Sequence, residues 1–386
     1  MSSSLAPFGT SIFTEMTRLA ERLQAVNLSQ GFPDFDGPEE LRRLAAEAIL
    51  AGPNQYAPSA GVPELRQAVA AKLARFHGLR VDPEREVTVT AGATEGLAAT
   101  LLGLLDPGDE VILFEPFYDL YPAMVARAGA RPVPVRLEGP DFSLDPAALR
   151  RAFTARTRAV LVNNPQNPCG KVWSAQELAL LGALCLEFGA VAIGDEVYEH
   201  LVYDGGRHLS LLALPGLREA SVVISSTAKT FSMTGWKVGY AVAAPALSAA
   251  VRAAHQFLTF CTPAPLQRAM AVGLGSPDAY YLDLLAAYAT RRARLCDALD
   301  ALGLEVARPA GTYYATWRIA GLGCEDDLAF CRRLAEEAGV AAIPFSVFYQ
   351  DRRGGRDLVR LAFCKQDATL DEAIRRLRRW REGQRR

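Results

Sequence analysis

Two lysines lie eight positions apart in the segment SSTAKTFSMTGWKVGY, which carries no other charge. Only five of the 42 basic residues in the chain are lysine, so Lys229 and Lys237 call for an explanation that arginine would not meet. A guanidinium stays protonated and is a poor nucleophile, whereas its surroundings can deprotonate a primary amine, which then condenses with a carbonyl. The pair indicates either carbonyl chemistry or two ordinary lysines on a loop.

The elements that must position these lysines alternate along the chain from about residue 85 onward. Short β-branched runs, separated by helical stretches of ten or more residues, predict a mostly parallel sheet covered on both faces. The expected strands span residues 86–92, 109–116, 158–164, 190–196, 221–225 and 238–244. The expected helices between them include residues 94–105, 118–129 and 174–188.

After Pro263 the pattern becomes that of a smaller α+β domain. Its expected elements are helices at 277–302 and 326–338, a final helix, and the short stretches GTYYATW, GVAAIP and LVRLAF. The N-terminal segment is too short and too poor in strands to stand alone. We therefore expect residues 1–45 to pack with a small domain at 276–386, beside a large domain at 46–275.

Candidate side chains stand where the expected strands end, which is where open α/β sheets bind ligands. Lys229 lies four residues past the strand at 221–225. The turn AGATEG offers backbone N–H groups, a hydroxyl and a helix N-terminus, and so makes either an anion site or a plain turn. Asp195, with Tyr198 three residues on, ends another strand as a ligand-binding carboxylate, a helix cap or a buried ion-pair partner.

Two further groups belong to the same rim. Asn167, in NNPQNPCG, is either held as an amide hydrogen-bonder or only forms a rigid turn. Phe117 and Tyr118 follow the strand at 109–116. One cofactor requires all of these groups together, pyridoxal phosphate, whose aldehyde, phosphate, flat ring, phenolic oxygen and pyridine nitrogen each need one of them. Buried beside a cation, Asp195 is expected to stay ionised and to keep the pyridine nitrogen protonated.

At these motifs the sequence resembles the class I/II, fold-type I aminotransferases. SSTAKTFSMTGWKVGY is similar to their Schiff-base lysine signature, NNPQNPCG to their Asn-Pro-x-Asn-Pro-x-Gly element, and GDEVYEHLVYD to their Asp-x-x-Tyr element. The resemblance runs from about Ser11 to the last helix. It implies an α/β fold in which a mostly parallel seven-stranded sheet lies between helices, a smaller α+β domain, and a homodimer. Cys169 and Lys237 depart from the family's usual Thr or Ser and from its frequent arginine.

The resemblance also implies roles for residues around the cofactor. Lys229 forms the Schiff base, leaves it when the substrate amine arrives, and shuttles the α-proton. Asn167 and Tyr198 bond the phenolic oxygen, Asp195 bonds the pyridine nitrogen, and Tyr118 stacks on the ring. The implied phosphate ligands are Gly92, Ala93, Thr94, Ser226, Lys237 and, from the neighbouring subunit, Tyr56.

For the substrate, the resemblance makes Arg360 the residue that grips the carboxylate with bidentate geometry, assisted by Asn167. Gly31 leaves room for that carboxylate. The stretches SQGFPDFDGP, HQFLTFCTPAPLQ and GVAAIPFSVFY are most similar to the methionine and kynurenine (glutamine–phenylpyruvate) aminotransferase branch. In that branch Phe13, Tyr56 and Phe260 line an apolar pocket.

The activity implied is ping-pong transfer of the amino group of a neutral amino acid (methionine, aromatic, glutamine or kynurenine) to a 2-oxo acid. No arginine in HQFLTFCTPAP provides a cation for a dicarboxylate side chain. Cysteine-conjugate β-elimination, decarboxylation and ring closure use the same machinery and remain alternatives. A ligand-sensing regulator module is a distant one, since no basic helix pair precedes GFPDF.

The composition of the chain indicates its partners and its cellular compartment. A formal charge of −1 does not favour nucleic acid or an acidic membrane as partner. Seven cysteines without a Cys-x-x-Cys pair suit reduced thiols in the cytoplasm, and we expect no metal centre. The N-terminus lacks a signal pattern, and the arginine-rich C-terminal stretch 375–386 predicts the solvated face of a last helix.

Overall fold

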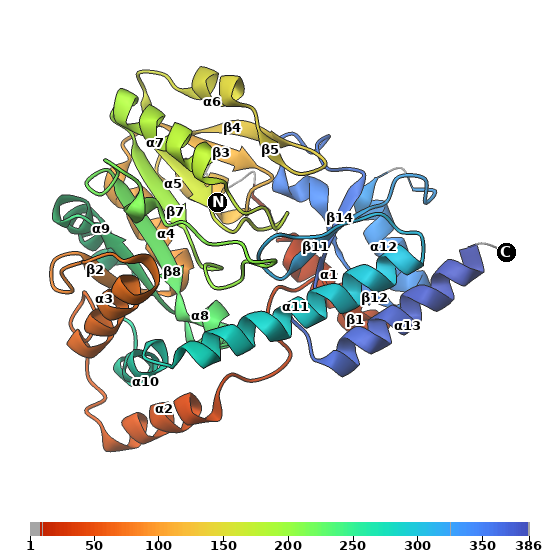
Figure 1. The fold of residues 1–386 in the computed structure, drawn as a ribbon, viewed down its shortest axis with the longest axis horizontal. Helices are drawn as coiled ribbons and strands as arrows, with labels where there is room; N and C mark the ends of the chain where they lie inside the picture. The colour runs from red at the N-terminus through yellow and green to blue at the C-terminus, as the bar shows by residue number, and fades with distance from the viewer. Residues whose placement is uncertain (1–7, 10, 325, 385–386) are drawn as a thin grey trace.

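An eight-stranded sheet dominates the computed structural model, which describes residues 8–9, 11–324 and 326–384 (Figure 1). Its strands, in spatial order, are β2 (Val87–Ala91), β9 (Val238–Ala243), β8 (Ser221–Ser226), β7 (Val191–Asp195), β6 (Thr157–Asn163), β3 (Glu110–Glu115), β4 (Arg131–Glu138) and β5 (Ser143–Leu144). β9 runs antiparallel to both of its neighbours and β5 runs antiparallel to β4, while the other neighbouring pairs are parallel. The mostly parallel sheet expected from the sequence is confirmed, with seven longer strands and the two-residue β5 added at the edge.

The central strands are apolar without interruption because both faces of the sheet are covered. In β8, Val222 and Ile224 point into one hydrophobic cluster and Val223 into the other. β3 alternates in the same way. Successive side chains of a strand point to opposite faces, so a continuous apolar run is what a doubly covered sheet needs.

Helices cover the two faces in separate sets. One face carries α4 (Gly92–Leu104), α5 (Leu120–Arg127) and α9 (Pro245–Leu258). The other carries α3 (Pro63–His77), α6 (Pro146–Ala152), α7 (Ala175–Phe188) and α10 (Ala264–Leu274). The α7 helix begins with a capping box, in which Ser174 and Glu177 bond each other's backbone N–H, so its start coincides with the predicted one.

The strand β4 was absent from the stretches expected from the sequence, and its two prolines explain why. Pro132 and Pro134 cannot donate to a ladder and argue against a central strand. They are tolerated here because β5 pairs only with the far end of β4, at Leu137 and Glu138. The proline-containing half of β4 therefore pairs along one side, with β3.

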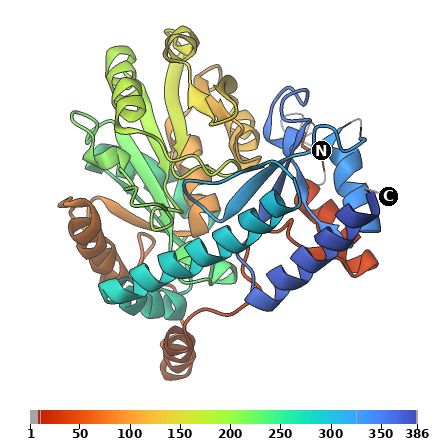
Figure 2. The ribbon, with the colours of Figure 1, turned by 45° about the vertical axis from the view of Figure 1, so that its right-hand side comes forward.

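The smaller part of the molecule is built on a four-stranded antiparallel sheet. Its strands, in spatial order, are β10 (Val306–Ala307), β11 (Tyr314–Arg318), β14 (Leu358–Ala362) and β13 (Ile343–Pro344). Its helices are α11 (Asp278–Ala301), α12 (Asp327–Glu337) and α13 (Asp367–Gln384). Both views show α11 crossing the molecule with α13 beside its C-terminal half (Figures 1 and 2).

The N-terminal segment contacts both parts. The strand β1 (Val26–Asn27) pairs in parallel with β12 (Val340–Ala341), and α1 (Ile12–Leu23) packs on α12. The helix α2 (Glu39–Ala51) packs on α10 instead and stands out from the body of the molecule (Figure 2). The packing of α2 on α10 places the end of this segment against a helix of the expected large domain, and the division of the chain at residues 45 and 275 stays a prediction.

Two further features concern the cysteines and the apolar character of the helices. All seven cysteines are free thiols. Within the described ranges, no helix combines the length and the apolar character needed to cross a bilayer.

Candidate active site

A cavity of about 410 Å³ opens at the carboxyl ends of the central strands, between the large sheet and β11 and β14 of the small one. Strand direction explains why it forms there: β6, β7 and β8 are parallel, so the residues that follow each of them emerge at one edge. The candidate residues lining the cavity are Phe13, Gly31, Ala93, Thr94, Tyr118, Asn167, Asp195, Tyr198, Lys229 and Arg360. Residues from motifs far apart in the sequence thus meet in one place.

Lys229 lies in the short helix α8 (Thr227–Thr230), directly after β8, and its amine faces the cavity. Burial lowers the pKa of Lys229, and the nearby cations of Lys237 and Arg360 act in the same direction. In the described chain its Nζ has no hydrogen-bond partner and lies 5.8 Å from the centroid of the Tyr198 ring. An amine that is poorly solvated and free of partners is easily deprotonated and ready to react with a carbonyl.

Asp195 ends β7 and is buried at the base of the cavity. Burial raises the pKa of its carboxyl to about 6, and hydrogen bonds from Tyr121 and from the backbone of Val197 counteract the rise. The Tyr121 hydroxyl donates at 2.7 Å, and Asn163 donates to the main-chain oxygen of Asp195 at 2.8 Å. The carboxylate is therefore mostly ionised at pH 7 and fixed in direction, as a partner for a protonated ring nitrogen must be.

The anion site expected at AGATEG stands at the N-terminus of α4. Gly92 adopts a left-handed backbone conformation with φ +75°, which favours glycine. A Cβ on Gly239 would lie 2.6 Å from the carbonyl carbon of Gly92, so the lack of a side chain lets β9 approach this helix end. That approach brings Lys237 Nζ to 3.5 Å from Thr94 Oγ1. A helix N-terminus, a hydroxyl and a lysine converge, which fits a phosphate.

Besides Tyr56, three predicted phosphate ligands, Gly92, Ser226 and Lys237, do not line the cavity itself. A Cβ on Gly92 would lie 3.2 Å from Lys237 Nζ, so these two residues are neighbours. The Ser226 hydroxyl caps α8 by accepting from the backbone N–H of Ala228 at 3.1 Å. The cap gives Ser226 a structural role whether or not it also binds an anion.

Arg360 lies on β14 with its side chain fully buried beneath the cavity. Its Nη1 donates to Asn167 Oδ1 at 2.8 Å and its Nη2 to the carbonyl oxygen of Ser29 at 2.9 Å, while Nε has no partner in the described chain. Within the described residues, no carboxylate forms an ion pair with Arg360. A buried, unneutralised guanidinium with a spare donor fits a ligand carboxylate.

Tyr118 and Tyr198 both line the cavity, together with Lys229 and Arg360. Tyr118 is partly exposed to the cavity, and its ring centroid lies 6.5 Å from that of Phe13. The Tyr198 hydroxyl lies 3.1 Å from the hydroxyl of Tyr314. The set thus offers a ring surface, a phenolic donor, a carboxylate, an amine and an anion site, which together match the functional groups of pyridoxal phosphate.

Two predicted residues lie away from the cavity of this chain. Tyr56 and Phe260 pack against each other on the surface, with ring centroids 5.3 Å apart, and Tyr56 is 84% exposed. Neither lines the cavity with Phe13. A role for them at a binding site therefore needs a second copy of the chain.

Sequence reasoning missed several polar residues of the cavity, among them Asn163, Tyr121 and Tyr314. A signal existed for two of them. Asn163 precedes the recognised element by one residue within NNPQNPCG, and Tyr121 follows Tyr118 at helical spacing. For Tyr314 the sequence shows only one of two adjacent tyrosines in a strand, which point to opposite faces.

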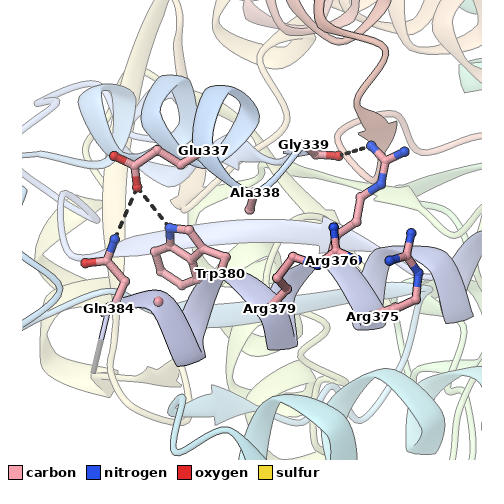
Figure 3. Close-up of a pocket in the computed structure, with 9 residues that line it drawn as sticks. Glu337, Ala338, Gly339, Arg375, Arg376, Arg379, Trp380 and Gln384 are labelled. Carbon is pink, nitrogen blue, oxygen red and sulfur yellow. Dashed lines mark hydrogen bonds between the residues drawn. The ribbon is translucent and has the colours of Figure 1, made fainter. Parts of the chain in front are cut away.

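A second hollow, of about 500 Å³, lies between α12 and α13 at the arginine-rich end of the chain (Figure 3). Trp380 Nε1 donates to Glu337 Oε2 at 3.0 Å, and Arg376 donates to the carbonyl oxygen of Gly339 at 2.9 Å. Arg375 and Arg376 also share the carboxylate of Glu372. These contacts tie α13 to its neighbours, while the exposure of Arg375, Arg378 and Arg379 fits the predicted solvated helix face.

Comparison with known proteins gives consistent matches. A family model described as aminotransferase class I and II matches residues 24–377. A Mycobacterium tuberculosis protein named probable N-succinyldiaminopimelate aminotransferase is 48% identical over 385 residues, which cover 97% of each chain. Escherichia coli methionine aminotransferase is 44% identical over 376 residues and covers 97% of each chain.

Two further matches extend this range. Human kynurenine–oxoglutarate transaminase 1 is 36% identical over 402 residues, covering 96% of this chain and 95% of its own. The solved structure of N-succinyldiaminopimelate aminotransferase from Mycobacterium tuberculosis has a TM-score of 0.96 at 48% identity, covering 98% of this chain and all of that one.

Proposed function

The chain belongs to the class I and II aminotransferases, and on that premise we propose that it transfers the amino group of an amino acid with a neutral side chain to a 2-oxo acid. The family's cofactor is pyridoxal 5′-phosphate. When bound, it supplies an aldehyde that takes up the amino group and a pyridinium ring that stabilises negative charge at the substrate's α-carbon.

The proposed cofactor contacts follow the geometry of the cavity. Lys229 is the residue that binds the aldehyde, Tyr118 covers the ring, and Asp195 holds the proton of the ring nitrogen. Asn167 and Tyr198 bond the phenolic oxygen. The proposed phosphate ligands are Gly92, Ala93, Thr94, Ser226 and Lys237, with Tyr56 of a second copy.

The chemical step then depends on three side chains of this chain. Arg360, whose Nε has no partner in the described chain, holds the α-carboxylate, which fixes the Cα–H bond in the cavity. Lys229, whose pKa burial lowers, takes the α-proton and returns it on the cofactor side. Asp195 stays ionised and buried, so it opposes loss of the ring proton while this transfer proceeds.

The observation that carries the substrate class is the charge of the cavity wall. Among the residues that line it in the described chain, the cations are Lys229 and Arg360, and both already have a part in the reaction. The rest of the wall toward Phe13 is aromatic or neutral. A neutral donor such as methionine, an aromatic amino acid, glutamine or kynurenine leaves no charge unpaired there. Relatives named for methionine and for kynurenine support the same class.

A second candidate is an N-succinylated diamino acid with a distal carboxylate. The 48% identity to the protein named for N-succinyldiaminopimelate favours it. The cation for such a carboxylate would come from outside the wall of the single-chain cavity, because Arg360 and Lys229 are both engaged.

We also propose that the working unit is a homodimer in the cytoplasm. Tyr56 and Phe257 are 84% and 86% exposed, and apolar side chains of this size on a surface are typical of an interface. The free state of all seven cysteines supports a reducing compartment. Sedimentation of the purified protein tests the dimer, and a monomer with full activity would refute it.

The decisive experiment is a panel of amino donors against a few 2-oxo acids, with products identified by mass. We expect methionine, phenylalanine, glutamine or kynurenine to give a keto acid only when an acceptor is present. This dependence distinguishes transamination from β-elimination, which needs no acceptor. Preference for N-succinyl-diaminopimelate by more than tenfold in kcat/KM would establish the second candidate. Lys229→Arg is expected to fold and to lose turnover, and substantial activity in that variant would refute the assignment of Lys229.

A further inference from the structure

Tyr314, which no motif predicted, touches three of the proposed active-site residues at once. It lies on β11, is 3% exposed, and lines the cavity. Its hydroxyl lies 3.1 Å from the hydroxyl of Tyr198, and its ring centroid lies 4.1 Å from the guanidinium carbon of Arg360. A Cβ on Gly31 would lie 1.9 Å from the Tyr314 hydroxyl oxygen.

A bound cofactor would decide which of the two hydroxyls, of Tyr198 or of Tyr314, donates the hydrogen bond between them. Each hydroxyl has one proton to donate, and either oxygen of this pair is able to be the donor. If Tyr198 donates its proton to the phenolic oxygen of the cofactor, the bond to Tyr314 persists only with Tyr314 as donor. A donated hydrogen bond polarises the acceptor hydroxyl, so Tyr314 makes Tyr198 a stronger donor.

The ring of Tyr314 has a separate effect on Arg360. It is one of three aromatic rings around the guanidinium, together with Phe13 and Phe348, whose centroids each lie 5.2 Å away. A flat guanidinium stacked on a ring keeps its in-plane donors free for a carboxylate. Tyr314 gives the shortest of the three distances.

Tyr314 also explains why residue 31 is a glycine. The volume that a side chain at position 31 would fill is occupied by the Tyr314 hydroxyl, which is buried and bonded and so cannot move away at little cost. The neighbouring Tyr313 behaves differently, because its hydroxyl donates to the carbonyl oxygen of Gly31 at 2.7 Å.

We propose that Tyr314 is a positioning residue with two separable actions: its hydroxyl orients and strengthens Tyr198 toward the cofactor's phenolic oxygen, and its ring holds Arg360 flat for the substrate carboxylate. This inference rests on the proposed function. It predicts that the two actions respond to different substitutions, since phenylalanine keeps the ring and leucine keeps neither group.

The test follows the visible absorbance of the purified holoenzyme against pH, together with binding of 3-phenylpropionate as a carboxylate probe. A donor to the phenolic oxygen stabilises its negative charge and so favours the deprotonated form of the lysine-bound cofactor. In Tyr314→Phe we therefore expect the pH midpoint of the colour change to rise by roughly half a pH unit to one unit, with probe affinity kept. In Tyr314→Leu we expect the same shift and a probe affinity three- to tenfold weaker, by about the strength of a cation–π contact.

Two controls separate positioning from general disturbance. Tyr281→Phe removes another buried hydroxyl, which does not line the cavity and donates to the Leu274 carbonyl oxygen at a distance of 3.1 Å. This variant should leave the pH midpoint unchanged. In a Tyr198→Phe background, adding Tyr314→Phe should shift the midpoint no further, because the relay is already cut.

An unshifted midpoint in Tyr314→Phe, an equal shift in Tyr281→Phe, or a full additional shift in the double variant would each overturn the inference while leaving the proposed function intact. A wild-type protein that binds no pyridoxal phosphate would instead refute the proposed function, and the inference with it.

Discussion

Tyr121 donates a hydrogen bond of 2.7 Å to Asp195 Oδ2 and so joins α5 to the end of β7 inside the cavity. The other carboxylate oxygen accepts a longer bond, of 3.4 Å, from the backbone N–H of Val197. Burial raises the pKa of Asp195 to about 6, and the bond from Tyr121 is the largest of the effects that oppose the rise. The charge of Asp195 therefore depends on a tyrosine from a different element.

Tyr121→Phe is expected to weaken cofactor binding through Asp195. A hydrogen bond to a charged acceptor contributes about 1.5–3 kcal/mol, so the dissociation constant of pyridoxal phosphate should rise roughly ten- to hundredfold. The pKa of Asp195 should rise as well, which moves the acid limb of kcat/KM to higher pH. Fluorescence titration of the apoprotein and a pH–rate profile measure the two effects. Unchanged cofactor affinity would show that Tyr121 is not needed to support the carboxylate.

The sequence was sufficient to predict residues whose position follows from strand direction. Asp195 and Lys229 come directly after parallel strands, so their meeting at one edge requires only the alternation of strands and helices. Arg360 is different, since it reaches the cavity from the small sheet. No rule of strand order relates the two sheets, so Arg360 was predicted from the family resemblance alone.

The residues that sequence reasoning missed depend on packing between distant elements. Tyr314 bonds Tyr198 across 116 positions of the chain, and nothing in GTYYATW tells which of its tyrosines faces the cavity. Tyr121 bonds Asp195 across 74 positions. The strand β4 was missed for a local reason, because its prolines are tolerated only where one side of the strand is left unpaired.

Asp195→Asn is expected to stabilise the apoprotein at alkaline pH. The folded-state pKa of Asp195, about 6, lies above the ordinary aspartate value of 3.8, so folding favours the protonated form. Its contribution is present below pH 3.8 and is lost as the pH rises through 6. At pH 8 the buried carboxylate is charged, and a neutral amide should add about 1–3 kcal/mol of stability.

Urea unfolding of the apoproteins at pH 5 and pH 8 measures this difference, which should be smaller at pH 5. With pyridoxal phosphate bound, wild type should be more stable than Asp195→Asn, because the amide cannot hold the ring proton as an ion pair. Equal stabilities of the two apoproteins at pH 8 would contradict a destabilising charge at Asp195.

Gly31→Ala should damage the carboxylate site through Tyr314. The new Cβ would lie 1.9 Å from the Tyr314 hydroxyl oxygen and 2.7 Å from the ring carbon that carries it, so the ring must move away from Arg360. Overpacking of this kind costs about 1–3 kcal/mol of stability. Displacement of a substrate-positioning group should raise KM for the amino donor by roughly tenfold or more.

Gly235→Ala provides the matched control, since Gly235 is exposed near Lys229 in sequence and a Cβ there meets nothing within 4 Å. Steady-state kinetics with a saturating acceptor distinguish the two variants. Equal KM values would mean that the loop carrying Gly31 moves aside without disturbing Arg360.

A buried ionic cluster behind the cavity, centred on Glu199, should be essential for stability. Glu199 forms an ion pair with Lys72, accepts from Ser225 Oγ at 2.7 Å, and lies 2.8 Å from His77 Nε2. Burial by itself raises the pKa of Glu199, but Lys72 and His77 lower it well below its ordinary value. Glu199→Gln leaves the Lys72 ammonium buried without its carboxylate, which costs about 3–5 kcal/mol.

The pH dependence of that loss follows from the lowered pKa. Stability from ionised Glu199 is present above its unfolded pKa of about 4.3 and is lost only as the pH falls toward the folded value. The difference in urea midpoint between wild type and Glu199→Gln should therefore hold from pH 5 to pH 8 and narrow below about pH 4. Adding Lys72→Met should recover much of the lost stability, since it removes the unpaired buried charge.

Glu47→Gln, at an exposed pair with Arg43, should change stability by less than about 1 kcal/mol. If Glu199→Gln were as mild as that surface change, water would have to reach Lys72, and the cluster would not be the closed ion pair that its burial indicates.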